Sequence, residues 1–153
     1  MMERILVGLD GSPGSEAALN WAIDLAKALN AEITAVHVFE MPYPMLIPAA
    51  GGVPMGIGGE VGSLEQSLRE AIREKFRTDW CAPLANAGVR YREEFGEGRA
   101  GPVLEEAARK VRADLIVTGR RGLSSLHEVF AGSVSQHLVH NAGVPVVIIP
   151  HAA

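Results

Sequence analysis

Short, uninterrupted apolar runs recur along the chain and predict strands that are buried on both faces. The first run, residues 4–9, reads Arg-Ile-Leu-Val-Gly-Leu, and further runs occupy residues 33–39, 115–118 and 145–149. Such runs are typical of a parallel sheet that is covered by helices on both sides. A more polar run at residues 89–95 predicts a strand at an edge of the sheet.

The segments between these runs carry apolar residues at the spacing of amphipathic helices. Helices are predicted over residues 15–29, 64–84, 102–112 and 133–141. Strands that alternate with helices in this way predict an α/β fold, a doubly wound, Rossmann-like, five-stranded parallel sheet built by right-handed crossovers. The length of 153 residues suits a single domain, so we expect residues 1–153 to form one unit.

Two stretches interrupt the alternation of strands and helices. Residues 41–62 hold 6 of the 17 glycines and 4 of the 9 prolines, which predicts a flexible loop insert rather than a helix or a central strand. Residues 119–131 separate a strand from a helix by more than the usual connection of about two to six residues. This second stretch follows the carboxyl end of a strand, where open α/β sheets bind ligands.

Composition and charge narrow the possible partners. The formal net charge is −4 and the isoelectric point is about 5.7, which argues against binding to nucleic acid or to anionic membranes. The lone cysteine, Cys81, excludes an internal disulfide and is interpreted as a buried packing thiol. His137 and His140 share a helix face and are interpreted as surface or packing histidines rather than metal ligands. The apolar runs are far shorter than the roughly 18 residues that span a bilayer, so we expect a cytoplasmic protein.

A glycine-rich motif provides the strongest candidate for a binding site. Gly119-Arg-Arg-Gly122 is followed, after nine residues, by Gly132-Ser133 at the start of a predicted helix. Glycines let the main chain approach a phosphate closely, and the N–H groups at a helix N-terminus bind anions. The alternative is a plain loop followed by a helix whose N-cap is serine, and the spacing alone favours neither interpretation.

Asp10 directly follows the first predicted strand and is a second candidate. Its carboxylate can accept hydrogen bonds from an adenine amino group or a ribose hydroxyl, as acids do at comparable positions in nucleotide-binding folds. The alternative is a local turn or a helix N-cap near Gly11-Ser12. For Asp10 taken alone, this alternative is favoured.

Taken together, several segments resemble the universal stress protein family. They read Gly8-Leu-Asp-Gly-Ser12, His37-Val38, Thr118-Gly-Arg-Arg-Gly122, Gly132-Ser-Val-Ser135 and Val144-Pro-Val-Val147. The resemblance covers residues 4–150, and the pattern G-x2-G-x9-G-S/T, typical of the ATP-binding branch of that family, is complete. It implies the strand order 3-2-1-4-5, with ATP between the ends of strands 1 and 4.

The resemblance also implies which residues hold the nucleotide. The adenine and ribose end is implied at Leu9, Asp10 and Val38. The implied positions along the ribose and the phosphates are Gly119 and Gly122, and those that hold the phosphates are Gly132, Ser133, Val134 and Ser135. Thr118 and Arg120 complete the implied set of nucleotide-binding residues. Thr118 stands where Met is common in the family, and Arg120 stands where Ser is common, which adds a positive charge beside the phosphates.

These features favour an ATP-binding stress-response or regulatory protein that acts through nucleotide binding and dimerisation. The resemblance implies a homodimer formed through the last strand, residues 145–149, and leaves open whether Mg²⁺ accompanies ATP. No group of general base, nucleophile and metal ligand is visible near the glycine motif, so no catalytic or metal-binding residue is assigned. Two alternatives stay open: a slow ATPase or nucleotidyl-transfer enzyme, with His127 or Glu128 as candidate groups, and a nucleotide-free structural dimer.

Overall fold

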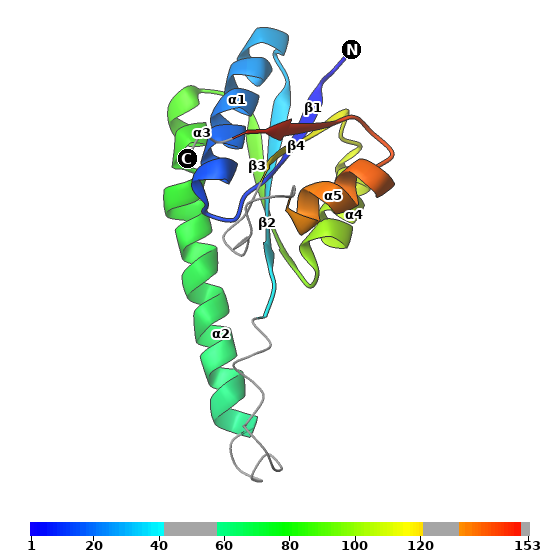
Figure 1. The fold of residues 1–153 in the computed structure, drawn as a ribbon. Coiled ribbons are helices and arrows are strands. Elements are labelled where there is room, and N and C mark those ends of the chain that lie inside the picture. Colours follow the sequence, from blue (N-terminus) through cyan, green and yellow to red (C-terminus); the bar gives the residue numbers. More distant parts are fainter. Residues whose placement is uncertain (42–57, 121–131, 151–153) are drawn as a thin grey trace.

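The computed structural model describes residues 1–41, 58–120 and 132–150, and its centre is a five-stranded parallel sheet (Figure 1). The strands are β1 (Arg4–Gly8), β2 (Glu32–Phe39), β3 (Tyr91–Glu97), β4 (Leu115–Gly119) and β5 (Val146–Ile149). Their order is β3-β2-β1-β4-β5. The predicted fold class and strand order are confirmed, with the polar strand β3 at one edge and the apolar strand β5 at the other.

Helices cover both faces of the sheet, which explains why the strands read as continuous apolar runs. One face carries α1 (Pro13–Leu29), α2 (Gly58–Lys75) and α3 (Ala82–Ala87), and the other carries α4 (Ala100–Val111) and α5 (Ser133–Asn141) (Figure 1). In β1, Ile5 and Val7 enter the core beneath α1, whereas Leu6 between them enters the core beneath α4. Successive residues of a strand point to opposite faces, so each central strand contributes to both cores.

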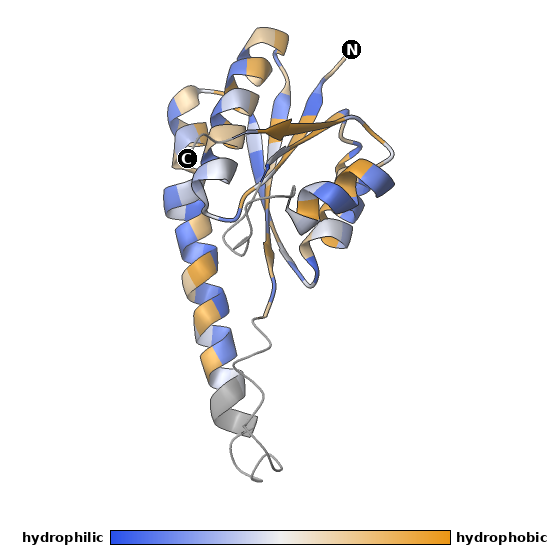
Figure 2. Ribbon diagram, in the orientation of Figure 1, coloured by the Kyte–Doolittle hydropathy of each residue, from blue (hydrophilic) through white to orange (hydrophobic). Residues whose placement is uncertain are grey.

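The helix α2 begins earlier than the sequence pattern predicts. Its first residue is Gly58, so residues 58–62 of the predicted loop insert are helical, and residues 42–57 of that insert lie outside the described residues. Glycine lowers helix stability by only about 1 kcal/mol per residue, and a helix that is already nucleated gains a hydrogen bond with each added residue. The helix extends well beyond the sheet and carries apolar and polar residues in turn along its length (Figures 1 and 2). No helix in the described ranges is long and apolar enough to cross a membrane.

The long helix predicted over residues 64–84 is divided into three pieces. α2 ends at Lys75, the residues Phe76–Trp80 form a π-helical turn, and α3 begins at Ala82. Pro83 in the first turn of α3 explains the division, because proline lacks an N–H and its ring excludes the carbonyl four residues earlier. Cys81 lies at the junction as a buried free thiol, which confirms the prediction, and burial raises its pKa to about 12.

Candidate functional site

The turn between β1 and α1 is closed by its own side chains. The Oδ1 atom of Asp10 accepts hydrogen bonds from the main-chain N–H of Ser12 at 3.0 Å and from the Ser12 hydroxyl at 2.5 Å. Ser12 is the N-cap of α1, and its hydroxyl oxygen accepts the main-chain N–H of Ser15 at 3.2 Å. The local turn that was the alternative role of Asp10 is therefore present, and α1 begins two residues before the predicted start at Ser15.

Trp80 lies directly against this turn. Gly11 has a φ of +78°, and a Cβ atom built on it would lie 2.4 Å from Cζ2 of Trp80, so both the backbone and the contact require glycine. The two residues line a cavity of about 150 Å³ together with Leu9. A larger and more open hollow of about 420 Å³, lined by Arg73 and Phe95 among others, shares no lining residue with it. Nothing in the sequence pattern pointed to Trp80, which is distant from the turn along the chain.

The end of β2 completes this side of the site. His37 donates a hydrogen bond from Nδ1 to the main-chain carbonyl of Leu9 at 2.7 Å, and its ring meets the indole of Trp80 edge-on at a centroid distance of 5.0 Å. Burial lowers the pKa of His37, which favours the neutral imidazole. Val38, the next residue, is buried. Leu9, Asp10 and Val38 are thus brought to the neighbouring ends of β1 and β2.

The end of β4 packs against the start of α1. A Cβ atom built on Gly119 would lie 2.6 Å from the carbonyl carbon of Gly14 and 3.0 Å from the main-chain nitrogen of Ser15. Residue 119 must therefore be glycine because the strand packs so closely against the helix, whether or not it also contacts a ligand. Thr118, one residue earlier, is buried on the opposite face of the sheet, where its Cγ2 lies near Gly8 of β1.

The end of β4 is also tied to the start of α5. The main-chain carbonyl of Arg120 accepts a hydrogen bond from the N–H of Gly132 at 2.7 Å, and the N–H of Arg120 donates to the carbonyl of Ile149 at 3.1 Å. The two halves of the glycine motif therefore meet, with the exposed side chain of Arg120 beside them. Gly122 lies outside the described residues.

Among the described residues, no side chain caps the N-terminus of α5. Its N-cap is Gly132, so the serine cap considered as an alternative for Ser133 is wrong. The buried hydroxyl of Ser135 donates back to the carbonyl of Gly132 at 2.9 Å. The first main-chain bond of the helix runs from Gln136 to Gly132 at 3.0 Å. The N–H groups of Ser133, Val134 and Ser135 come before this first helical hydrogen bond, so they have no acceptor within the helix. Such N–H groups at a helix N-terminus can bind an anion.

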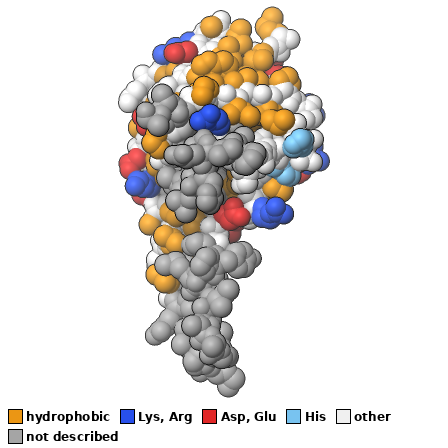
Figure 3. Space-filling view, in the orientation of Figure 1, with side chains coloured by type: hydrophobic (Ala, Val, Ile, Leu, Met, Phe, Trp, Pro, Cys, Tyr) orange, Lys and Arg blue, Asp and Glu red, His pale blue; other side chains and the backbone are white. Residues whose placement is uncertain are grey.

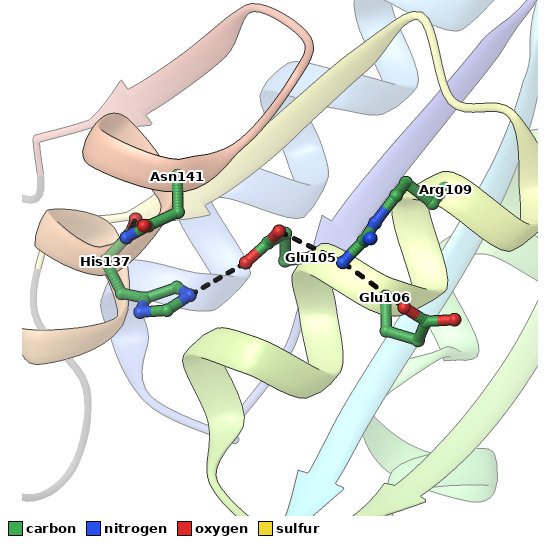
Figure 4. Close-up of polar contacts among 5 residues, drawn as sticks. All are labelled: Glu105, Glu106, Arg109, His137 and Asn141. Atoms are coloured by element: carbon green, nitrogen blue, oxygen red, sulfur yellow. Dashed lines mark hydrogen bonds and ion pairs between the residues drawn. The ribbon is translucent and has the colours of Figure 1, made fainter.

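A side-chain hydrogen bond joins α5 to α4. His137 of α5 points toward Glu105 of α4, with Nε2 3.0 Å from Oε2, and Glu105 also pairs with Arg109 at 3.1 Å (Figure 4). A Cβ atom built on Gly101 would lie 2.7 Å from the ring of His137, so this histidine packs closely on α4. The prediction of a packing histidine is confirmed, with an acidic partner that the sequence pattern did not reveal. No group of three or more metal-binding side chains occurs in residues 1–41, 58–120 and 132–150.

Comparison with known proteins agrees with this geometry. The model of the universal stress protein family matches residues 1–150. The stress response protein NhaX of Bacillus subtilis (strain 168) is 34% identical, and the alignment covers 96% of this chain and 97% of that protein. The solved structure of hypothetical protein MJ0577 superposes with a TM-score of 0.82 at 20% identity, covering 99% of this chain and 98% of that one. A universal stress protein solved in complex with cAMP gives a TM-score of 0.69 at 24% identity, covering 97% of both chains. Because the family pattern extends along almost the whole sequence and the sheet order agrees with it, the chain belongs to the universal stress protein family.

Proposed function

We propose that this protein binds ATP and acts as a stress-response regulator through nucleotide binding and dimerisation. The observation that carries the proposal is the uncapped N-terminus of α5, which lies at the end of β4 because Gly132 donates a hydrogen bond to Arg120. A phosphate group accepts hydrogen bonds from successive main-chain N–H groups at such a terminus and is attracted by the positive end of the helix dipole. A cytoplasmic location, where ATP is available and the free thiol of Cys81 stays reduced, completes the proposal.

The two sides of the site suit the two ends of the nucleotide. We assign the phosphates to the first turn of α5, from Gly132 to Ser135, and to the exposed guanidinium of Arg120. We assign the adenine and ribose to the ends of β1 and β2, at Leu9, Asp10 and Val38. The connecting positions are Thr118, Gly119 and Gly122. A solved protein of the same fold holds cAMP, which supports the assignment of an adenine nucleotide.

The side chains described around the first turn of α5 suit binding rather than turnover. Arg120, Ser133 and Ser135 include no carboxylate or imidazole that could serve as a general base. His127 and Glu128, the candidate groups for a slow ATPase, lie outside the described residues. When Mg²⁺ accompanies ATP, we expect the phosphates to supply ligands to it, as substrate phosphates usually do for this ion. We propose that the protein responds to ATP without consuming it at an appreciable rate.

We further propose that β5 forms the interface of a homodimer. It is an edge strand of four half-buried apolar residues, and Figure 3 shows hydrophobic side chains gathered over it. The carbonyls of Pro145 and Ile149 accept hydrogen bonds from the β4 side. Alternate residues of a parallel strand bond to the same neighbour, so the main-chain groups of Val146 and Ile148 face the outer edge. A second copy can pair there across a two-fold axis.

Thermal unfolding with and without ATP and Mg²⁺ tests the nucleotide proposal. A ligand present at about 100 times its Kd stabilises the folded state by about 2.7 kcal/mol, so the midpoint should rise clearly. The variant Gly132→Val should lose this rise, because a branched side chain obstructs the approach of phosphate to the first turn of α5. An undiminished rise in the variant would refute the assignment of the phosphates. Conversion of ATP to ADP over hours by the parent protein, absent in the variant, would instead support a slow ATPase.

Light scattering tests the dimer. Ile148→Pro removes an outward N–H without removing a bond to β4, so the parent should run as a dimer and the variant as a monomer. Ile148→Val keeps the N–H and is the matched control, which should remain dimeric. A parent protein that is monomeric at micromolar concentration would refute the interface.

A further inference from the structure

Thr118 buries a hydroxyl group that finds no hydrogen-bond partner among the described residues. The residue is 4% exposed, and its Oγ1 atom is shielded from water. A buried hydroxyl without a partner destabilises the folded state, and a valine would fill the same space without that cost. Unpaired buried polar groups are rare in folded proteins, so the presence of threonine here points to a partner that arrives from outside the chain.

The position of Thr118 lies between the two ends of the proposed nucleotide site. It is the penultimate residue of β4 and pairs in register with Ile148 of β5, while its Cγ2 lies 3.7 Å from an ideal Cβ on Gly8 of β1. Its side chain is on the α4 and α5 face of the sheet, the layer that contains the uncapped N-terminus of α5. Asp10 follows Gly8 by two residues, so Thr118 stands between the base end and the phosphate end.

We propose that the hydroxyl of Thr118 binds a hydroxyl of the ribose and makes this protein select ribonucleotides over deoxyribonucleotides. The inference rests on the proposed ATP site. The part of a nucleotide between base and phosphate is the ribose, whose hydroxyls both donate and accept hydrogen bonds, as threonine does. Because Oγ1 is shielded in the ligand-free chain, the ribose must displace the atoms that now cover it.

Calorimetric titration with ATP, 2′-deoxy-ATP and 3′-deoxy-ATP tests the selectivity. The parent protein should bind ATP about 3- to 10-fold more tightly than at least one deoxy analogue, the value of one buried neutral hydrogen bond. Thr118→Val should bind ATP more weakly and lose the preference, whereas Thr118→Ser, which retains a hydroxyl, should keep it. Thr34→Val, the same exchange at a buried position in the middle of β2, is the matched control and should keep the parent preference.

The stability of the ligand-free protein provides a second test, because Thr118→Val should weaken ATP binding without lowering stability. Thr118→Val should leave Tm unchanged or raise it by up to about 4 °C, because an unpaired hydroxyl is replaced by a methyl group of the same shape. A clear fall in Tm would show that the hydroxyl already has a partner, such as a buried water, and would overturn the inference. An unchanged preference in Thr118→Val would overturn it as well, while ATP binding itself would still stand. A parent protein that binds none of the three nucleotides would refute the proposed function and this inference with it.

Discussion

Two helices, α1 and α5, begin near the carboxyl ends of neighbouring strands, yet the main-chain N–H groups of their first turns differ in whether a side chain accepts a hydrogen bond from them. In α1 the hydroxyl of Ser12 accepts the N–H of Ser15 and also donates to Asp10. In α5 the N-cap is Gly132, which has no side chain to accept an N–H, and the hydroxyl of Ser135 donates to the carbonyl of Gly132. Both helices carry serine in their first turn, so the difference lies in the residue at the N-cap, serine in α1 and glycine in α5.

This difference indicates which of the two helices can receive a phosphate. Both helices have the positive end of a dipole at this edge, but the first turn of α1 is already served by the side chains of Ser12 and Asp10. The first turn of α5 lacks such a cap among the described residues. An anion-binding helix terminus is therefore identified by what its own side chains leave unsatisfied.

Giving α5 a cap of its own should produce the largest effect. Asp is among the best N-cap residues, so Gly132→Asp should occupy the N–H groups of the first turn and place a negative charge where the phosphate binds. ATP affinity, measured by calorimetry, should fall by about 100-fold or more, since juxtaposed like charges cost several kcal/mol. The ligand-free protein should be as stable as the parent or slightly more stable.

The variant Gly132→Ser separates the effect of a capping hydrogen bond at α5 from the effect of a negative charge there. A neutral serine cap competes for the same N–H groups without repelling phosphate, so the loss of ATP affinity should be smaller than for Gly132→Asp. Equal affinity for ATP in the parent and in Gly132→Asp would show that the phosphates do not bind at α5.

Arg120→Ala should have the next largest effect, on affinity alone. Arg120 is exposed, and its main-chain carbonyl is bonded to Gly132 at the start of α5, so without its charge ATP should bind about tenfold more weakly while adenosine binds as before. The free energy of unfolding should change by no more than about 0.5 kcal/mol, as for most surface substitutions. Arg92→Ala, near the opposite end of the sheet, is the control, and equal losses for ATP and adenosine would contradict the role of Arg120.

Removing the cap of α1 should reduce stability. Ser12→Ala leaves the N–H of Ser15 without its acceptor, so urea unfolding should show a loss of about 1 kcal/mol. The corresponding exchange on α5, Ser133→Ala, should leave stability unchanged, because this serine caps nothing. Equal losses in the two variants would remove the distinction between the helices.

The smallest expected effect is on the pH dependence of the free energy of unfolding, through His37 beside the end of β1. Burial lowers the pKa of His37, and the hydrogen bond to Leu9 and the charge of Asp10 oppose this more weakly. Below the ordinary value of about 6.5, the unfolded chain takes up a proton that the folded chain resists, so stability is lost as pH falls from about 7.5 to about 5.5. His37→Asn retains an N–H donor and does not titrate, so its urea midpoint should fall less over this range. A parent and a variant with the same pH dependence would exclude this contribution.

The candidate site was only partly predictable from the sequence. The glycine spacing and the placement of Asp10 pointed to the ends of β4 and β1, because such signals are local. The alternative of an N-cap near Gly11-Ser12 is confirmed, because capping is a local contact. The packing of Gly119 on Gly14 was not predictable, nor was the buried hydroxyl of Thr118, which has no partner among the described residues. Each of them depends on how close segments that are distant along the chain approach one another.

By itself the sequence determined the alternation of strands and helices and the burial of the central strands. These properties follow from the period of apolar residues, which is set within each segment. The tertiary structure alone decided that Trp80 covers Gly11 and that Glu105 meets His137. Contacts of this kind depend on the register of the strands and on how the helices pack on the two faces of the sheet. The spacing of apolar residues within one segment carries no information about its distance from other segments.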